Sequence, residues 1–484
     1  MRTVWIGLLS GLFLLGGCAA APIEPPRSTI SAEPATVTDA PDAATIGDPP
    51  DGTGPSPPPD GASPDDAPPI FNHPSVVGAS DAALEASPDD TTPIDAPAAP
   101  ASEFIHASGK DLVVAEGAAI RTIQLRGINV QSFWLLAPDD LSNPFINDDQ
   151  DRGVPIASLI PTRYDETVVT NIAALGANVI RNAVNYRQFE DNAAPYAYKP
   201  EGWAQLDEQI ALAKAAGLYT IIDLHVPPGG LQGVAGASAR LWEDVELQDR
   251  TASLWQAIAA RYQDEPWVAG YDLINEPMPT QRPSQWATFA QRLVDAIRVN
   301  DKNHLIIVGE IVAVVDAAGN YPPIDPNASW IPKVADENVM YDFHFYKPLD
   351  YVGQGRPENG LGDNGQIYPD ATHTYVDDAG NPVGVRDKAY LQRLLDEKLA
   401  FGRIYNVPMN VGEFSPSRIT FFSDSTMGGL EYTADLMDLM NVAGLNYEFY
   451  AYLNVFFLDW EYAEMPELYA VTDALSQTIK QGMQ

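Results

Sequence analysis

Short apolar runs alternate with amphipathic stretches from about residue 103 to the end of the chain. Apolar runs bounded by polar or turn residues are typical of buried strands, and the stretches between them have helical periodicity, as in Trp203–Ala216 and Trp255–Gln263. The predicted strands are Ile123–Asn129, Asn178–Ala183, Tyr219–His225, Gly270–Asn275, Leu305–Val308, Val339–His344, Pro408–Glu413 and Asn446–Tyr452.

This alternation predicts an α/β fold in which residues 103–484 form a (β/α)₈ TIM barrel. A doubly wound open sheet is the alternative, and against it no Gly-x-Gly-x-x-Gly follows an early strand. Phe104–Val114 and Ala119–Leu125 predict a short N-terminal β-hairpin before the barrel. The long loops near 135–160 and 350–390 exceed what a connection needs, so we expect them to shape a cleft.

The region before the barrel differs in composition. Residues 21–100 contain 19 prolines and 14 acidic residues but one arginine and one aromatic residue. Such a segment has too little apolar surface to offset the entropy lost on ordering. We therefore expect residues 19–102 to be a disordered Pro/Asp/Ala-rich tether that acts as a spacer. A ligand role for its proline runs is the alternative.

Residues 1–18 predict a lipoprotein signal peptide, because Arg2 precedes an apolar core, Val4–Leu15, that is too short to span a bilayer. Leu15-Gly16-Gly17-Cys18 resembles a bacterial lipobox, which implies acylation of Cys18 and attachment to a membrane. Ala19 in the next position resembles the pattern of outer-membrane lipoproteins. We therefore expect a lipid-anchored protein of the bacterial cell envelope, facing the periplasm or the outside. Ordinary secretion with cleavage near residues 19–21 is the alternative.

Charge and cysteine content exclude several classes of protein. The net charge of −38, from 28 basic and 66 acidic side chains, argues against a nucleic-acid partner and against docking on anionic lipid. The single cysteine excludes an intramolecular disulfide and a cysteine-based metal site. The six histidines show no His-Glu-x-x-His spacing. We therefore expect no metal and no cofactor, an uncharged substrate, and a monomer.

Polar residues end most of the predicted strands. In a barrel, strand ends of this kind converge on one rim, where catalytic groups are found. Each residue alone has a simpler explanation: Arg181 could pair on the surface, and His225 or His344 could be a core histidine. Together they indicate an active site. The residues are Asn129, Arg181, His225, Asn275, Glu276, His344, Tyr346 and Glu413.

Several ordered segments resemble glycoside hydrolase family 5, the cellulase and mannanase family, over about residues 104–470. They are Leu125-Arg126-Gly127-Ile128-Asn129, Val179-Ile180-Arg181, Ile221-Ile222-Asp223-Leu224-His225, Leu273-Ile274-Asn275-Glu276-Pro277, Phe343-His344-Phe345-Tyr346 and Val411-Gly412-Glu413-Phe414.

The resemblance implies that Glu276 is the general acid/base and Glu413 the nucleophile of a retaining glycosidase, with the two carboxyl groups roughly 5–5.5 Å apart. Arg181 and the Tyr346 hydroxyl would favour the ionised form of Glu413. Glu276, in a more apolar position, would hold its proton.

The resemblance also implies a substrate-binding set. Asn275 would contact the sugar 2-hydroxyl, and His225 and His344 would bind substrate hydroxyls or orient the carboxylates. Trp134 and Trp242 are our first choices for a sugar platform. The family usually has a tryptophan on the eighth strand, where this chain has Tyr447-Glu448-Phe449-Tyr450, so Tyr447 or nearby Trp460 is expected to replace it.

The resulting prediction is a tethered, cellulase-type enzyme that cleaves β-1,4-glucan, with an oligo- or polysaccharide as its partner. Within the family, mannan, β-1,3-glucan or a glycolipid are alternative substrates. A non-catalytic carbohydrate-binding lipoprotein is the alternative from another class. Against it, a pure binder would not need Glu276 and Glu413 together with Arg181, Asn275 and Tyr346.

Overall fold

The computed structural model describes residues 104–116, 119–130, 164–230, 232, 239–316, 318–323, 328–354, 365–376, 382–417, 419–422, 426–452 and 466–484. Within them, eight parallel strands form a closed barrel in the order β12-β13-β4-β5-β6-β7-β8-β9. The predicted TIM barrel is therefore confirmed. Its strands are β4 (Arg126–Val130), β5 (Val179–Asn185), β6 (Tyr219–Val226), β7 (Val268–Asp272), β8 (Leu305–Gly309), β9 (Val339–His344), β12 (Met409–Phe414) and β13 (Asn446–Tyr452).

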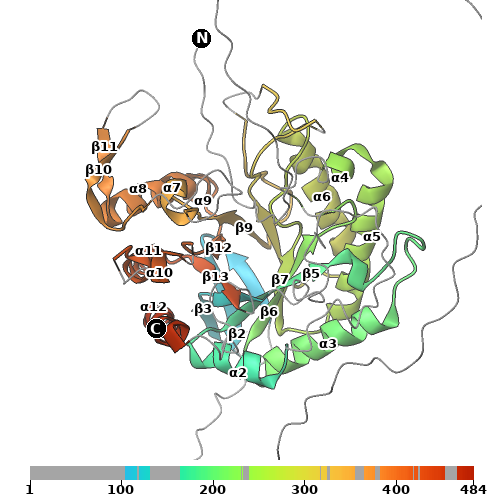
Figure 1. Ribbon diagram of the computed structural model, residues 1–484. Coiled ribbons are helices and arrows are strands. Elements are labelled where there is room, and N and C mark those ends of the chain that lie inside the picture. The colour runs from blue at the N-terminus through green and yellow to red at the C-terminus, as the bar shows by residue number, and fades with distance from the viewer. Residues whose placement is uncertain are drawn as a thin grey trace, which may run out of the picture. The chain divides into compact units, whose positions relative to one another are not determined.

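Helices lie around the outside of these strands (Figure 1). Their apolar faces pack on the strands in one large core, to which α5 contributes the fully buried Trp255 and α6 contributes Trp286. The helices are α2 (Glu166–Ala174), the 3₁₀ turn η1 (Tyr186–Gln188), α3 (Pro200–Ala215), α4 (Ala239–Glu243), α5 (Val245–Tyr262), α6 (Ser284–Arg298), α7 (Leu349–Val352), α8 (Lys388–Lys398), α9 (Ala400–Tyr405), α10 (Ile419–Phe422), α11 (Gly429–Ala443) and α12 (Pro466–Gly482).

A three-stranded antiparallel sheet packs against the N-terminal end of the barrel. It consists of β1 (Ile105–Ser108), β2 (Asp111–Glu116) and β3 (Ala119–Ile123). Apolar side chains of this sheet share a second core with residues of the barrel strands, including Leu305. The predicted hairpin gains a third strand because Gly109, at φ 59°, turns the chain within the segment expected to be one strand. This end of the barrel is closed, so the opposite rim carries the candidate site.

Two further differences from the prediction concern the rim of the barrel. β7 ends at Asp272, so Asn275 and Glu276 lie in the turn that follows the strand. The segment 350–390, expected to be a cleft loop, includes part of α7 and a hairpin of β10 (Asp370–Val376) and β11 (Pro382–Arg386). The loop expected at 135–160 lies outside the described residues.

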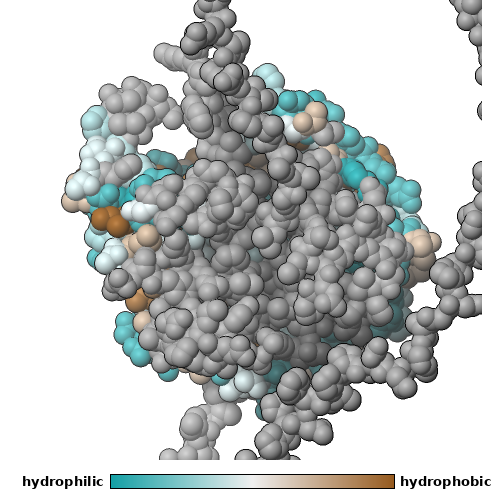
Figure 2. Space-filling view, viewed as in Figure 1, coloured by the Kyte–Doolittle hydropathy of each residue, from teal (hydrophilic) through white to brown (hydrophobic). Residues whose placement is uncertain are grey.

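The visible described surface is mainly hydrophilic, with separate apolar patches (Figure 2). Strongly exposed apolar side chains include Ile404 on α9 and Val442 on α11. Scattered apolar residues of this kind are ordinary on a protein surface. Among the described residues, no helix combines the length and the hydropathy needed to cross a membrane.

Candidate active site

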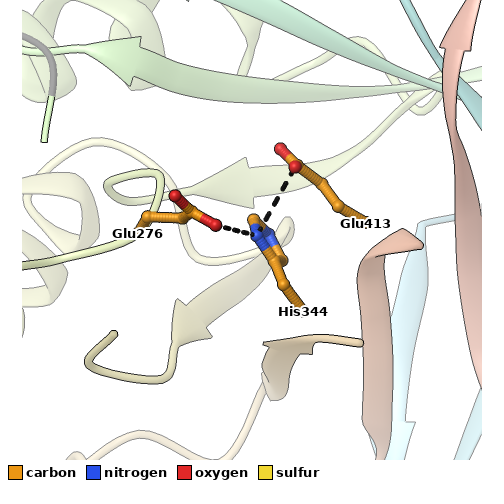
Figure 3. A group of neighbouring side chains, drawn as sticks. All are labelled: Glu276, His344 and Glu413. Carbon is orange, nitrogen blue, oxygen red and sulfur yellow. Dashed lines mark hydrogen bonds and ion pairs between the residues drawn. The ribbon is translucent and has the colours of Figure 1, made fainter. Parts of the chain in front are cut away.

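Two buried glutamates face one another at the C-terminal rim of the barrel. Glu276 follows β7, and Glu413 is the penultimate residue of β12. One oxygen of each carboxyl group and a ring nitrogen of His344 all lie within 4.8 Å of one another. His344 lies between the glutamates, with Nδ1 2.8 Å from Glu276 Oε1 and 3.6 Å from Glu413 Oε2 (Figure 3). The predicted pair is therefore brought together.

A break in the strand register turns Glu413 into the barrel. Gly412 faces the interior, because a Cβ there would lie 2.6 Å from Asp342 Oδ1. Strict alternation would then turn Glu413 outward. The pairing of β12 with both of its neighbours is irregular between Val411 and Phe414. Irregularities of this kind redirect side chains, and they are frequent at active sites.

Glu276 is aimed by an unusual backbone conformation. Its φ is 47°, in the left-handed region that residues other than glycine rarely adopt. Such a conformation costs of order 1–3 kcal/mol and persists only where the surrounding structure holds it. The backbone N–H of the preceding Asn275 donates to the carbonyl of Leu224 at 3.3 Å. The strain is consistent with a functional position for Glu276.

Glu413 has a hydrogen-bond donor at each oxygen. The Arg181 Nη1 donates to Oε1 at 3.1 Å, and the Tyr346 hydroxyl donates to Oε2 at 2.9 Å. Both donors favour the ionised carboxylate, which accepts hydrogen bonds but cannot donate them. These are the two partners that the sequence predicted for Glu413.

The surroundings of Glu276 favour its protonated form. Burial raises the pKa of Glu276 to about 7, while His225 and Arg181 lower it less strongly. Burial also lowers the pKa of His344 to about 4. His344 is therefore neutral at pH 7, and its contact with Glu276 is a hydrogen bond rather than an ion pair. The carboxyl O–H of Glu276 can donate to His344 Nδ1.

Arg181 is the cation at the centre of the site. Its guanidinium donates to Asp272 and Glu413 and contacts Asp223 Oδ1 at 3.1 Å. Burial alone would lower the pKa of Arg181, but these carboxylates raise it well above its usual value. Arg181 lies in the middle of β5 instead of at its end, as the sequence had suggested. From there it connects Asp223 and Asp272 inside the barrel to Glu413 at the rim.

His225 and Asn275 form a second hydrogen-bonded chain to Arg181. Asp223 Oδ2 lies 2.7 Å from His225 Nδ1, and Asn275 Nδ2 lies 3.2 Å from His225 Nε2. Burial lowers the pKa of His225 to about 4, so the neutral ring donates from Nδ1 and accepts at Nε2. Arg181 Nη2 donates to Asn275 Oδ1 at 3.0 Å. The amide oxygen of Asn275 therefore faces Arg181 and its nitrogen faces His225, and these two contacts fix the orientation of the amide.

A layer of buried acids lies below the pair and was missed in the sequence. Asn410 Nδ2 donates to Asp342 Oδ1 at 2.9 Å and to Glu448 Oε2 at 2.8 Å. Burial raises the pKa of Glu448 to about 8 and that of Asp342 well above its usual range. His344 Nε2 lies 3.5 Å from Asp342 Oδ2. Acidic residues two positions before His225 and His344, inside apolar strands, were the available signal.

The aromatic residues predicted for sugar binding lie elsewhere. Trp242 is 5% exposed, packs edge-on against Trp286, and donates to Gln232, so it is a core side chain. Tyr447 is fully buried, and its hydroxyl lies 2.9 Å from the Gly482 carbonyl of α12, outside the barrel. Both predictions were wrong. Trp134, Trp460 and Cys18 lie outside the described residues.

Tyr450 of β13 lies beside Tyr346, the tyrosine that donates to Glu413. Its ring lies 6.5 Å from that of Tyr346, nearly perpendicular to it. A two-residue period places Tyr450 on the same face of the strand as Glu448, while Tyr447 is on the other face. If one inward-facing residue of the strand had been known, this periodicity would have identified Tyr450 in the sequence as an aromatic residue that faces the site.

A hollow of about 600 Å³, including open solvent at its mouth, extends from the Glu276 side of the pair. It is lined by the C-terminal ends of β7, β8 and β9, by the residues that follow them, by Arg181 of β5 and by the end of α8. Its charged and hydrogen-bonding lining includes Glu276, Glu310, His344, Tyr346, Lys347 and Lys398. Glu413 is not part of this lining, so the hollow lies to the Glu276 side.

Glu276, His344 and Glu413 are also the group of possible metal ligands found among the described residues. Both oxygens of Glu413 already accept hydrogen bonds, from Arg181 and Tyr346. A cation bound between the glutamates would also lie near the Arg181 guanidinium, which would repel it. The donor set therefore fits a hydrogen-bonded carboxyl pair better than a metal centre.

Two glutamates with oxygens within 4.8 Å of each other at the C-terminal rim of a TIM barrel form the type of site found in retaining glycosidases. The family model for Cellulase (glycosyl hydrolase family 5) matches residues 146–451, which is more than half of the chain. This chain therefore belongs to the cellulase family, glycosyl hydrolase family 5.

Individual relatives match over shorter stretches. A β-xylosidase from Phanerodontia chrysosporium is 39% identical over 189 residues, which cover 38% of this chain and 38% of the relative. Endoglucanase C from Acetivibrio thermocellus is 25% identical over 193 residues, covering 40% of this chain and 53% of the relative. The chain thus spans between about two fifths and about half of the length of these relatives.

Solved structures share the fold. The endoglucanase Cel5A from Thermotoga maritima has a TM-score of 0.51 at 17% identity, covering 73% of this chain and 96% of that one. An endogalactoceramidase has a TM-score of 0.52 at 17% identity, covering 78% and 84%. At this level of identity the similarity concerns the fold alone.

Proposed function

We propose that this protein is a retaining glycoside hydrolase that cleaves β-linked glycans by double displacement. The observation that carries the proposal is the separation of Glu276 and Glu413, whose nearest oxygens lie within 4.8 Å. Inverting enzymes need about 6.5–9.5 Å between the carboxyl groups to admit a water molecule, and retaining enzymes need about 5–5.5 Å.

In the first step the Glu413 carboxylate attacks the anomeric carbon, and the bond to the leaving oxygen breaks. Protonated Glu276 gives its proton to that oxygen, and its pKa of about 7 keeps this form populated up to neutral pH. Arg181 and Tyr346 hold the Glu413 carboxylate in place for the attack. The product is a glycosyl ester of Glu413 and a free leaving group.

In the second step a water molecule enters next to Glu276, which is now ionised. Glu276 takes one proton from the water, and the water oxygen attacks the anomeric carbon. Glu413 leaves as a carboxylate, so the enzyme returns to its starting protonation state. Two inversions at the same carbon retain the anomeric configuration.

β-1,4-Glucan is the substrate that we propose first, in line with the endoglucanase similarities. A β-xyloside is the second candidate, and the 39% identity to a β-xylosidase favours it. Anchoring through Cys18 stays a prediction from the sequence. The alternative of a non-catalytic carbohydrate-binding protein would leave the strained Glu276 and its raised pKa without a role.

Glu276→Ala is expected to separate natural glycans from activated substrates. Hydrolysis of oligosaccharides should slow by about 10²–10⁴-fold, because their leaving oxygen needs a proton. A 2,4-dinitrophenyl glycoside needs no such proton, so its glycosylation step should slow by less than about tenfold. The measurement is kcat/KM for both substrate types. Glu208→Ala, on the exposed side of α3, is the matched control.

The pH profile provides a second readout of the same variant. In the parent protein kcat/KM should fall as the pH rises through about 7, because free Glu276 then loses its proton. In Glu276→Ala this alkaline limb should be absent for the activated substrate. Equal slowing of both substrate types, with the limb retained, would show that Glu276 is not the acid.

A further inference from the structure

The hollow beside Glu276 contains a lysine without a close counter-ion. Lys347 directly follows Tyr346, lines the hollow, and is half-buried. Among the described residues, its ammonium makes no hydrogen bond to another side chain and no ion pair within 4.0 Å. A half-buried cation without a close partner is uncommon, because burial of an unpaired charge is costly. The chain has 28 basic and 66 acidic residues, so a carboxylate counter-ion for Lys347 is not excluded by a shortage of acidic side chains.

The acids near Lys347 are engaged elsewhere or lie further away. Glu310 Oε2 forms an ion pair with Lys398 at 2.5 Å. Burial, followed by the repulsion of Lys398, lowers the pKa of Lys347, and the opposing attraction of Glu310 and Glu397 does not offset them. Within the described part of the chain, Lys347 therefore has no carboxylate of its own, because Glu310 pairs with Lys398 and the exposed Glu397 does not line the hollow.

The position of Lys347 is fixed by its neighbours. The Tyr432 hydroxyl donates to the Lys347 carbonyl at 2.6 Å, and the preceding Tyr346 donates to Glu413. The backbone at Lys347 is therefore held at a fixed position relative to Glu413. A side chain on such a backbone binds a ligand at a smaller entropic cost than one on a free loop.

The side of the hollow determines which part of a substrate it receives. Glu276 lines it, and Glu413 does not. In the proposed reaction Glu276 protonates the leaving oxygen, so the group beyond that oxygen enters the hollow. Lys347 then faces the leaving group and not the sugar that becomes attached to Glu413.

We propose that Lys347 makes this hollow a leaving-group subsite for an acidic substituent, with a carboxylate as the simplest case. The proposal rests on the proposed function and specifies its substrate class further. The leaving group would be an acidic sugar, such as a hexuronate unit, or another carboxylated aglycone. Lys398 contributes additional positive charge, which its ion pair with Glu310 partly neutralises.

The test uses two aryl glycosides that differ in charge and are similar in shape, the 4-carboxyphenyl and 4-carbamoylphenyl β-cellobiosides, with the corresponding β-xylosides as a second pair. The readout is the ratio of kcat/KM for the carboxylate to that for the amide. We expect the parent protein to prefer the carboxylate, and Lys347→Met to lower the ratio by about tenfold. Lys347→Arg should keep most of it. Lys110→Met, on the exposed β1–β2 turn, is the matched control and should leave the ratio unchanged.

The overall charge strengthens this test. A protein of net charge −38 repels carboxylates, so a preference for them has to come from a local cation. Product inhibition of the parent provides a measurement without any variant: 4-hydroxybenzoate should inhibit more strongly than 4-hydroxybenzamide.

The two proposals fail in different ways. Hydrolysis of both glycosides with equal ratios in the parent and in Lys347→Met would overturn the acidic subsite and leave the proposed function intact. A folded parent that hydrolyses none of these glycosides, nor β-1,4-glucan, would overturn both.

Discussion

Glu413→Ala is expected to lower kcat by ~10⁴-fold or more, because the glycosyl ester can no longer form. The buried partners remain in the variant: Arg181 and Tyr346 still point at the vacated position. The variant should therefore bind substrate and fold, yet fail at the first chemical step. The measurement is kcat on the best substrate of a panel of β-glucans, mannan, xylan and aryl glycosides.

Added azide should restore part of the lost turnover. The small anion fits the space of the missing carboxylate and attacks the anomeric carbon, giving a glycosyl azide of inverted configuration when the leaving group is activated. Glu208→Ala on α3 should retain parent activity and show no response to azide. Parent-level activity of Glu413→Ala would contradict the nucleophile assignment.

Arg181→Met is expected to lower the free energy of unfolding by ~3–5 kcal/mol, the usual cost of removing one partner of a buried ion pair. The substitution leaves Asp223, Asp272 and Glu413 buried without their shared cation. Burial already raises the pKa of Asp223 and of Asp272 to about 6 even with Arg181 present. Without the cation their pKa values should rise further.

The loss of stability should therefore depend on pH. Carboxyls with a raised pKa in the folded state bind protons that the unfolded chain releases, so the variant gains stability as the pH falls. The deficit relative to the parent should be largest near pH 8 and smaller near pH 5.5. Denaturant unfolding at both pH values measures it.

The matched control for this prediction is Arg261→Met. Arg261 pairs with Asp207 on the surface and is 40% exposed, so its loss should cost less than about 1 kcal/mol. A deficit for Arg181→Met no larger than that of the control would show that Arg181 does not hold the site together.

The barrel strands could be predicted because continuous apolar runs are typical of parallel strands that are buried on both faces. The last strand, Asn446–Tyr452, has the predicted bounds. The same continuity hides which residues face inward. Arg181 was expected at the end of its strand, whereas the structure places it in the middle of β5 with its charge toward the barrel interior.

The confusion of Tyr447 with Tyr450 has the same origin. Two tyrosines three positions apart lie on opposite faces of a strand, and only a side-chain contact reveals which face is the interior. In β13 that contact is made by Glu448, which accepts from Asn410. Glu413 could not have been oriented by alternation at all, since the irregular register of β12 reverses it.

Trapping of the covalent intermediate tests the central claim most directly. The parent protein is incubated with 2,4-dinitrophenyl 2-deoxy-2-fluoro-β-cellobioside or -xyloside. The fluorine slows both steps, and the activated leaving group speeds only the first, so the glycosyl ester accumulates. Mass spectrometry of the digested protein should find one added glycosyl group on the peptide that contains Glu413, and none in Glu413→Ala. Release of dinitrophenol with the label on another residue, or with direct inversion at the anomeric carbon, would contradict the proposed mechanism.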